Sequence, residues 1–136
     1  MDWKLELVVV PVSDVDRAKT FYTQRVGFNE DHDYTLSDEM RVVQLTPPGS
    51  ACSIAIGTGL AESQPGSVQG LQLVVSDIEA ARTELVERGV EVSEVQELVE
   101  GAWVSANPPF DEWNSFVFFN DPDGNGWAVQ QGLARD

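Results

Sequence analysis

The pattern of apolar positions predicts one strand, one helix and three further strands in the first half of the chain. The strands are expected at Leu5–Val10, Phe28–Tyr34, Met40–Leu45 and Cys52–Ile56. The helix is expected to begin at Ser13, a favoured N-cap residue, and to end at Gly27, which accepts the left-handed conformation of a C-terminal cap. Its apolar stripe comprises Ala18, Phe21, Tyr22 and Val26.

The second half repeats this order. Strands are expected at Leu71–Val75, Val90–Val95, Ser115–Asn120 and Gly126–Gln131. Ser76 is the expected N-cap of the second helix, with Glu79 completing a Ser-x-x-Glu capping box, and Gly89 is its expected end. The longer stretch Leu98–Asn114, which contains Trp103, Phe110 and Trp113, is predicted to be an elaborated loop.

Two sequence markers indicate a duplication. Val12-Ser13-Asp14-Val15 returns as Val75-Ser76-Asp77-Ile78 after 63 residues, and the turn at Pro47 returns at Pro122 after 75 residues. Two copies favour a pair of modules over a solenoid, which needs at least about three repeats. The sequence therefore predicts an α+β domain, 1–136, made of two tandem βαβββ modules, about 4–57 and 70–131, joined by a linker at 58–69 and sharing a cleft.

The charge narrows the range of partners. With 8 basic and 23 acidic residues the net charge is −15, which disfavours nucleic acid and anionic membranes as partners. The acidity indicates solubility or, as a more specific interpretation, attraction of a cationic ligand. Cys52 is the single cysteine, and neither a signal peptide nor a membrane-spanning run is apparent, so a cytoplasmic location is expected.

The repeated unit, with Pro11-Val12-Ser13-Asp14 opening the first helix and Phe119-x-Asp-Pro-Asp-Gly-Asn125 near the end, resembles the vicinal oxygen chelate superfamily over roughly residues 4–131. That superfamily includes glyoxalase I, extradiol dioxygenases, fosfomycin-resistance enzymes and bleomycin-binding proteins. The resemblance implies an open, incomplete barrel around the cleft, with the helices outside.

The resemblance also implies where metal ligands would lie. The family positions fall on Leu7, Gly70, Ala128 and, in the first module, Ser53 or Ile54. Leucine, glycine and alanine have no donor atoms in their side chains, whereas an open first-row metal site needs about three protein ligands. No metal and no cofactor are therefore expected. His32, the single histidine, is interpreted as an exposed or rim residue rather than as a ligand.

Strand alternation predicts an apolar and aromatic lining for the cleft. The expected ligand-binding residues are Leu7, Val9, Gln44 (or its neighbour Val43), Gln72, Phe116, Phe118 and Gln130, with Trp103 and Trp113 from the loop. Three alternatives remain open. Gln72 and Gln130 bind a ligand or each other. Arg41 anchors an anion or pairs with Asp38 or Glu39. The aromatic loop residues form a lid or pack onto the sheet.

Three functions compete. The first is a metal-independent protein that binds a hydrophobic or aromatic small molecule, for sequestration or resistance. The second is a divergent lyase, isomerase, hydrolase or dioxygenase-like enzyme with a non-standard site, using His32, Glu6, Asp33 or Asp111 as base. The third is a non-catalytic interaction module. A homodimer is expected under all three, because twofold association is the commonest oligomeric state.

Overall fold

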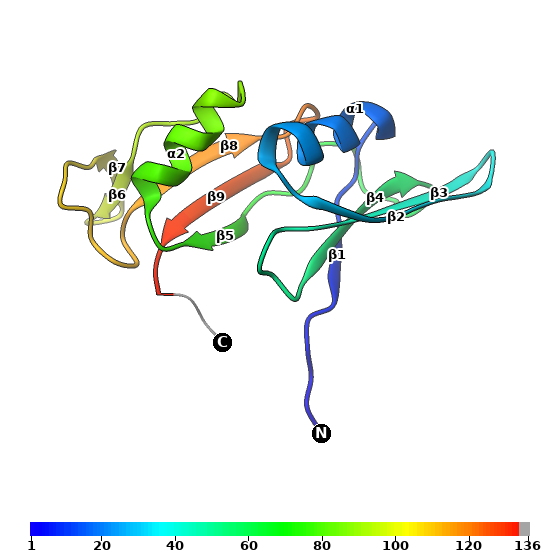
Figure 1. The fold of residues 1–136 in the computed structure, drawn as a ribbon, viewed down its shortest axis with the longest axis horizontal. Coiled ribbons are helices and arrows are strands. Elements are labelled where there is room, and N and C mark those ends of the chain that lie inside the picture. Colours follow the sequence, from blue (N-terminus) through cyan, green and yellow to red (C-terminus); the bar gives the residue numbers. More distant parts are fainter. Residues whose placement is uncertain (134–136) are drawn as a thin grey trace. The chain divides into compact units, whose positions relative to one another are not determined.

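The computed structural model describes residues 1–133, and the chain separates into two compact units (Figure 1). The first unit comprises Met1–Val68 together with the short segment Asp121–Asn125. The second unit comprises Gln69–Asn120 and the chain from Gly126 onward. Each unit is built on one mixed sheet and is described in turn.

The first unit has a four-stranded sheet in the order β1-β4-β3-β2, with β1 parallel to β4 and the other pairs antiparallel. Helix α1 and the π-helix η1 cover one face of this sheet (Figure 1). The elements are β1 (Leu7–Val9), α1 (Val15–Thr20), η1 (Phe21–Val26), β2 (Asn29–Ser37), β3 (Met40–Thr46) and β4 (Ser53–Thr58).

Alternation along β3 and β4 builds the core of the first unit. Val43, Leu45 and Ile56 are fully buried, and they lie on the face that carries the helices. Ala18 and Tyr22 meet this face from α1 and η1 and are equally buried. The predicted apolar stripe therefore packs as expected, although the helix changes to π geometry at Phe21.

The N-cap of the first helix lies one residue later in the chain than predicted. Asp14, not Ser13, is the N-cap of α1, and its carboxylate accepts the Arg17 N–H at 3.0 Å. Ser13 binds Asp123 instead, through its backbone N–H at 3.1 Å and its hydroxyl at 2.6 Å. The predicted end of this helical segment is confirmed, because Gly27 adopts a φ of 89°.

The turn Asp121–Asn125 is held in the first unit by a buried polar network. The Asp121 carboxylate accepts the Tyr22 hydroxyl at 2.8 Å, the Asn125 side-chain amide at 2.8 Å and the Asn125 backbone N–H at 2.9 Å. Asn125, which is fully buried, also donates to the Pro11 carbonyl and accepts the Val68 N–H. The Asp-Pro-Asp-Gly-Asn motif thus has a structural role in this chain, since every polar group of its first and last side chains is used.

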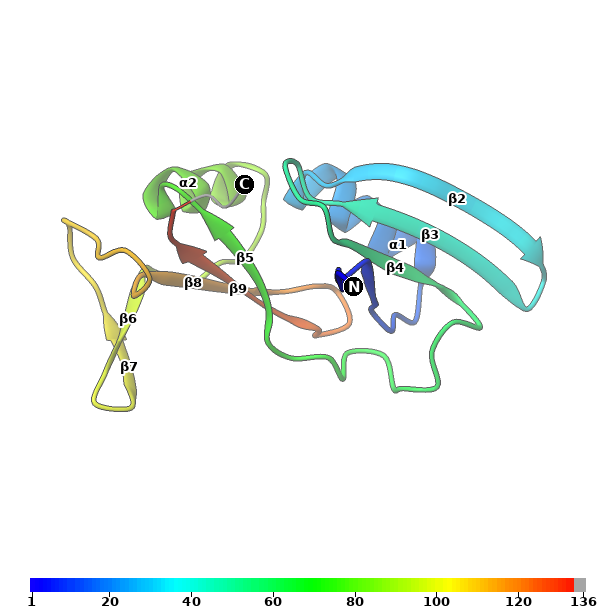
Figure 2. The ribbon, with the colours of Figure 1, turned by 90° about the horizontal axis from the view of Figure 1, so that it is seen from below.

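The second unit has a five-stranded sheet in the order β5-β9-β8-β6-β7. Helix α2 lies across one face of β5, β9 and β8 (Figure 2). The elements are β5 (Leu71–Val75), α2 (Ile78–Glu87), β6 (Gln96–Val99), β7 (Ala102–Ser105), β8 (Phe116–Asn120) and β9 (Gly126–Gln131). With one helix-covered mixed sheet in each unit, the predicted α+β class is confirmed.

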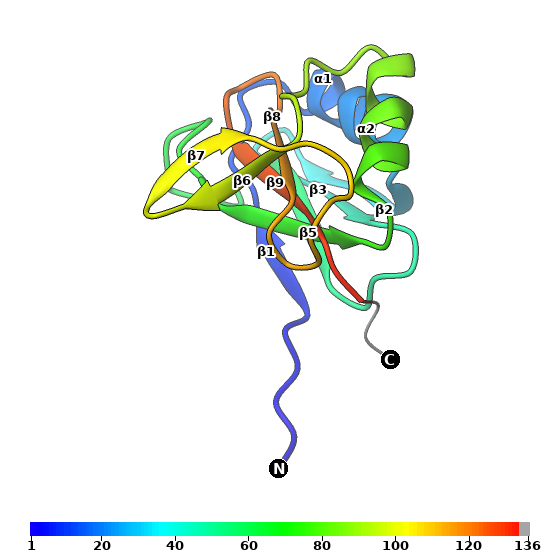
Figure 3. The same cartoon turned by 90° about the vertical axis from the view of Figure 1, so that its left-hand side faces the viewer.

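The strand predicted at Val90–Val95 is wrong. Only an isolated bridge between Val92 and Phe119 forms there, and β6 begins at Gln96. The segment predicted to be a loop, Leu98–Asn114, contains β7 and the second half of β6, whose hairpin extends away from β8 and β9 (Figure 3). Its turn places Glu100 and Gly101 at φ values of 50° and 83°. Two successive positive φ values are the geometry of a type I′ hairpin turn.

Helix α2 is joined to the sheet by its N-terminus as well as by its apolar face. Asp77 is the N-cap, so the predicted capping by Ser76 is wrong by one residue, as in the first unit. The Ile78 N–H donates to the side-chain oxygen of Gln131 at 3.0 Å. Ile78 is fully buried, and Phe119 stacks on Trp127 with ring centroids 6.0 Å apart. Among the described residues, no helix is both long enough and apolar enough to cross a membrane.

Candidate functional site

The face of the second sheet opposite α2 carries a cluster of aromatic side chains. Phe116 and Phe118 alternate with the buried Val117 and Phe119 along β8, so they lie on the helix-free face. Trp103, from β7, meets each of the two rings edge-on with centroids 5.0 Å apart. We call Trp103, Phe116 and Phe118 the aromatic face. Sequence reasoning placed all three at a ligand site, and the structure brings them together.

Two glutamines adjoin the aromatic face. Phe116 lies opposite Gln130, and Ala128 lies opposite both Phe118 and Gln72. The Gln72 amide donates to the Gln130 side-chain oxygen at 2.8 Å, and the Gln130 amide donates to the Trp113 carbonyl at 2.8 Å. The two side chains therefore bind each other, one of the alternatives that the sequence left open. A ligand could use the remaining acceptor of Gln72.

A cavity of about 230 Å³ lies beside the aromatic face, within the second unit. Its walls include Phe118, Gly70 and Ala128, so two of the family metal positions and one member of the aromatic face share one hollow. Gly70 has a φ of 85°, and a Cβ there would meet no atom within 4 Å. Pockets for drug-sized ligands span about 300–1,000 Å³, so this cavity would hold one part of such a ligand.

The two tryptophans of the predicted lid have separate positions. Trp103 packs on the sheet. Trp113 lies at the end of β9, where its backbone N–H donates to the Gln131 carbonyl at 2.7 Å. The Trp113 ring lies so close to Gly132 that a Cβ at Gly132 would be 2.4 Å from it. Phe110 contributes a carbonyl that accepts the Gln131 amide at 3.1 Å. Packing onto the sheet, the second of the predicted alternatives, therefore describes Trp103, whereas Trp113 packs beside Gly132 at the end of β9.

The first unit carries the other three predicted ligand residues on its helix-free face. Leu7 lies opposite Ser53, while Ala55 lies opposite both Val9 and Gln44. Gln44, rather than its neighbour Val43, is on this face, because Val43 is fully buried against the helices. Gln44 donates to Asp31 at 3.3 Å and to Ser53 at 3.5 Å. The role of Asp31 was missed, because a β-bulge between Glu30 and His32 changes the alternation there.

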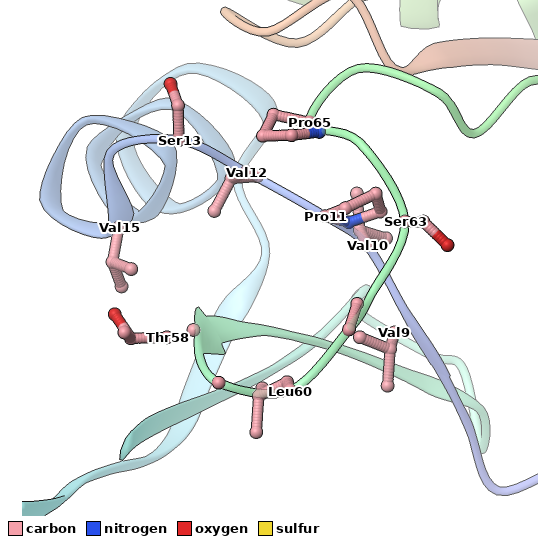
Figure 4. A pocket seen from close by; sticks show the side chains of 13 residues that line it. Val9, Val10, Pro11, Val12, Ser13, Val15, Thr58, Leu60, Ser63 and Pro65 are labelled. Carbon is pink, nitrogen blue, oxygen red and sulfur yellow. The ribbon is translucent and has the colours of Figure 1, made fainter. Parts of the chain in front are cut away.

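A separate cavity in the first unit, also about 230 Å³, lies between residues 9–15 and 57–65 (Figure 4). Val9 lines it, together with Val12 and Leu60, whereas Leu7 and Gln44 do not. Most of its wall consists of small aliphatic and proline residues. It brings together no group of side chains with evident chemistry.

The residues at the family metal positions do not fit a metal ion. Leu7, Gly70 and Ala128 offer no side-chain donor atom, and residues 1–133 contain no group of three His, Cys, Asp or Glu side chains placed so that they could hold a metal ion. The strand registers also correct one position. Val9 pairs with Ala55 as Gln72 pairs with Ala128, so Ala55 is the first-unit counterpart of Ala128. The predicted Ser53 or Ile54 is therefore wrong, because the chain from Pro47 to β4 is longer than the chain from Pro122 to β9.

Arg41 belongs to an ion-pair network on the helix side of the first sheet. Its guanidinium donates to both oxygens of Asp33, at 3.0 and 2.8 Å, and to Asp16 of α1 at 2.8 Å. Lys19 adds bonds to Asp33 at 2.7 Å and to Glu30 at 3.0 Å. The predicted partners Asp38 and Glu39 are therefore wrong, because alternation points Arg41 to the helix-covered face, toward Asp33 of β2 and Asp16 of α1, rather than toward the β2–β3 turn.

The network changes the acidity of its carboxylate. The Arg41 guanidinium, and after it the Lys19 ammonium, hold the pKa of Asp33 well below its usual range. An acid with so low a pKa is a weak proton acceptor, so Asp33 is a poor general base. His32 is exposed and stacks on Tyr34 with ring centroids 5.6 Å apart. Neither residue has a partner arrangement typical of acid–base catalysis.

Replacement of Asp33 by Asn should lower the free energy of unfolding by about 1–3 kcal/mol at pH 7, because the charge-assisted bonds are lost. The lowered pKa of Asp33 in the folded state stabilises the fold at pH values above the unfolded pKa of about 3.9. This stabilisation is lost as the pH falls below that value. The difference between wild type and variant should therefore shrink as the pH falls from 5 to 2. Urea titrations at several pH values measure this. Asp38→Asn, an exposed control, should change stability by less than about 0.5 kcal/mol.

The comparisons with known proteins agree with this arrangement. The model of the Glyoxalase/Bleomycin resistance protein/Dioxygenase superfamily matches residues 4–129, which is nearly the whole chain. The chain belongs to this superfamily, so the resemblance seen in the sequence is confirmed.

Three relatives are similar over almost their full lengths. TnmS3, an antibiotic binding protein from Streptomyces sp. CB03234, is 32% identical, with a TM-score of 0.75, over 97% of this chain and 98% of its own. A glyoxalase/bleomycin resistance protein from the same organism is 33% identical, with a TM-score of 0.72, over 94% of this chain and 100% of its own. YetH of Bacillus subtilis (strain 168) is 28% identical over 91% of this chain and 94% of its own.

Proposed function

We propose that this protein binds a hydrophobic or aromatic small molecule without a metal ion, for sequestration or resistance. The observation that carries the proposal is the shared position of Phe118. It belongs both to the aromatic face and to the wall of the cavity that Gly70 and Ala128 line. A planar ligand group could stack on the exposed part of Trp103 while a smaller substituent enters the cavity.

The chemistry of the cavity supports metal-independent binding. Where metal-using relatives carry ligands, this chain carries hydrogen at Gly70 and a methyl group at Ala128. Such positions offer space and apolar surface rather than Lewis-acid chemistry. The Gln72–Gln130 pair adds a polar edge that can orient a ligand, the usual combination in small-molecule pockets.

The similarity to TnmS3 supports the choice of ligand class, because that protein is described as an antibiotic binding protein. An aromatic antibiotic is therefore the first ligand to test. The net charge of −15 favours a cationic one, since the field of the protein raises the local concentration of cations.

Calorimetric titration with bleomycin and with proflavine, a planar aromatic cation, tests the proposal. We expect saturable binding of at least one probe. Trp103→Ala should weaken binding at least about tenfold, because an aromatic pair contributes about 0.5–1.5 kcal/mol beyond its buried area. Trp3→Ala is the matched control, since Trp3 is 87% exposed and belongs to the first unit. If neither probe binds, or if both variants bind like wild type, the proposal is wrong.

A further inference from the structure

Four polar side chains meet on the helix-free face of the first sheet: Asp31, Gln44, Thr46 and Ser53. The Ser53 and Thr46 hydroxyl oxygens are 2.7 Å apart, and Gln44 donates to Ser53 at 3.5 Å. The Thr46 hydroxyl and the Gln44 amide both donate to the same oxygen of Asp31. Ser53 is only 5% exposed, so the cluster has a buried base. We call these four residues the Asp31 cluster.

The backbone places this cluster by two features of the sheet. The bulge between Glu30 and His32 leaves Asp31 without a partner on β3, so its side chain is directed toward Thr46 and Gln44. Ser53 lies opposite Leu7 in the parallel pair of β1 and β4. An aliphatic side chain therefore borders the polar groups on one side.

The hydrogen-bonding atoms that remain unused in the Asp31 cluster are acceptors. The Thr46 hydroxyl hydrogen and the Gln44 amide are directed at one carboxylate oxygen, Asp31 Oδ2. Asp31 Oδ1 and Gln44 Oε1 accept no hydrogen bond within residues 1–133. In the same range no lysine, arginine or histidine forms an ion pair with Asp31. One uncompensated negative charge and two unused acceptors fit a ligand that is both cationic and a hydrogen-bond donor.

We infer that the Asp31 cluster is a binding site for a protonated amine. An ammonium group offers up to three donors on one charge, which matches the acceptors of Asp31 and Gln44. A divalent calcium ion takes six to eight oxygen ligands, often from several carboxylates, and this cluster has one carboxylate. The inference goes beyond the proposed function, because the Asp31 cluster belongs to the first unit and the aromatic face to the second.

A matched pair of alkyl probes tests the site by itself. n-Butylammonium chloride and 1-butanol differ mainly in charge and donor number, and Leu7 can contact the alkyl chain of either. In amide-resolved NMR titrations at constant ionic strength, butylammonium should shift the Asp31, Gln44 and Ser53 resonances saturably, whereas butanol should not. Asp31→Asn should weaken this binding at least tenfold, and Asp38→Asn, an exposed matched control, should leave it within twofold.

Equal responses to the two probes, or unchanged butylammonium binding by Asp31→Asn, would overturn the inference. A titration with calcium chloride that moves the same resonances at lower concentration than butylammonium would also overturn it, in favour of a metal site. Neither alkyl probe has a ring that could stack on the aromatic face. The result is therefore independent of the proflavine titration, and failure of one proposal can be told from failure of the other.

Discussion

Replacement of Asp121 by Ala is expected to lower the free energy of unfolding by about 3–5 kcal/mol. The Asp121 carboxylate, in a side chain only 5% exposed, accepts the Tyr22 hydroxyl, the Asn125 side-chain amide and two backbone N–H groups of its own turn. Alanine removes all of these acceptors at once while the donors remain buried. The loss of a buried polar partner costs about 1–3 kcal/mol for each donor left behind, and more where a charge is involved.

Urea titration followed by far-UV circular dichroism measures this change. Tyr22→Phe removes one donor and leaves the carboxylate with its other bonds, so it should cost only about 1–2 kcal/mol. Asp38→Ala, an exposed aspartate on the β2–β3 turn, is the matched control and should change stability by less than about 0.5 kcal/mol. A loss below about 1 kcal/mol for Asp121→Ala would show that the turn contributes little to the fold.

Native-state hydrogen exchange locates the effect. The Val68 N–H donates to Asn125, and Asn125 is held by Asp121. Relative to wild type, Asp121→Ala should therefore raise the exchange rate of the Val68 amide more than the exchange rates of the core amides of β3. If exchange instead rises equally at every amide, the turn unfolds only together with the whole unit.

A contact of the same turn accounts for the start of the first helix, which was predicted one residue too early. Ser13-Asp14 and Ser76-Asp77 each offer two adjacent residues that favour the N-cap. In the first unit Ser13 is engaged by Asp123, which is distant in sequence, and Asp14 is left to cap the helix. Local propensity identifies each helix start to within one residue, and in the first unit a tertiary contact of Ser13 accompanies capping by Asp14.

The elements that alternation predicted well are those with a fully buried face. Val43, Leu45, Val117 and Phe119 are buried at every second position of β3 and β8, so their strands were found. The β6–β7 hairpin was missed because its strands are mostly exposed and because Glu100 occupies a turn position that usually carries Asn, Asp or Gly. The sequence therefore placed Trp103 near the site but did not predict β7, the strand that carries it.

The candidate site was predictable where it follows strand alternation and hidden where it depends on an irregularity. Phe116, Phe118 and Ala128 follow directly from the period of β8 and β9. Asp31 lies in a run of acidic residues and acquires its position only from the bulge in β2. Arg41 was expected to bind an anion or to pair with Asp38 or Glu39, but its partners are Asp33 on β2 and Asp16 on α1. Contacts between distant segments leave no local pattern in the sequence.

Filling the cavity of the second unit should abolish ligand binding without loss of the fold. Ala128 is 9% exposed and lines the cavity of about 230 Å³ together with Gly70 and Phe118. Leucine at this position adds three carbon atoms to the hollow that the proposed ligand would enter. We expect Ala128→Leu to weaken binding of the tightest probe at least about thirtyfold, or roughly 2 kcal/mol. Stability should fall by less than about 1.5 kcal/mol, because the added side chain occupies empty space.

Calorimetry and urea titration of the same preparations separate the two effects. Ala80→Leu makes the same chemical change at an exposed position of α2 and should leave both affinity and stability close to wild type. Loss of binding in Ala128→Leu together with an unchanged urea midpoint assigns the effect to occupation of the cavity. If Ala128→Leu binds as tightly as wild type, the ligand does not enter this cavity, and the aromatic face alone would have to hold it.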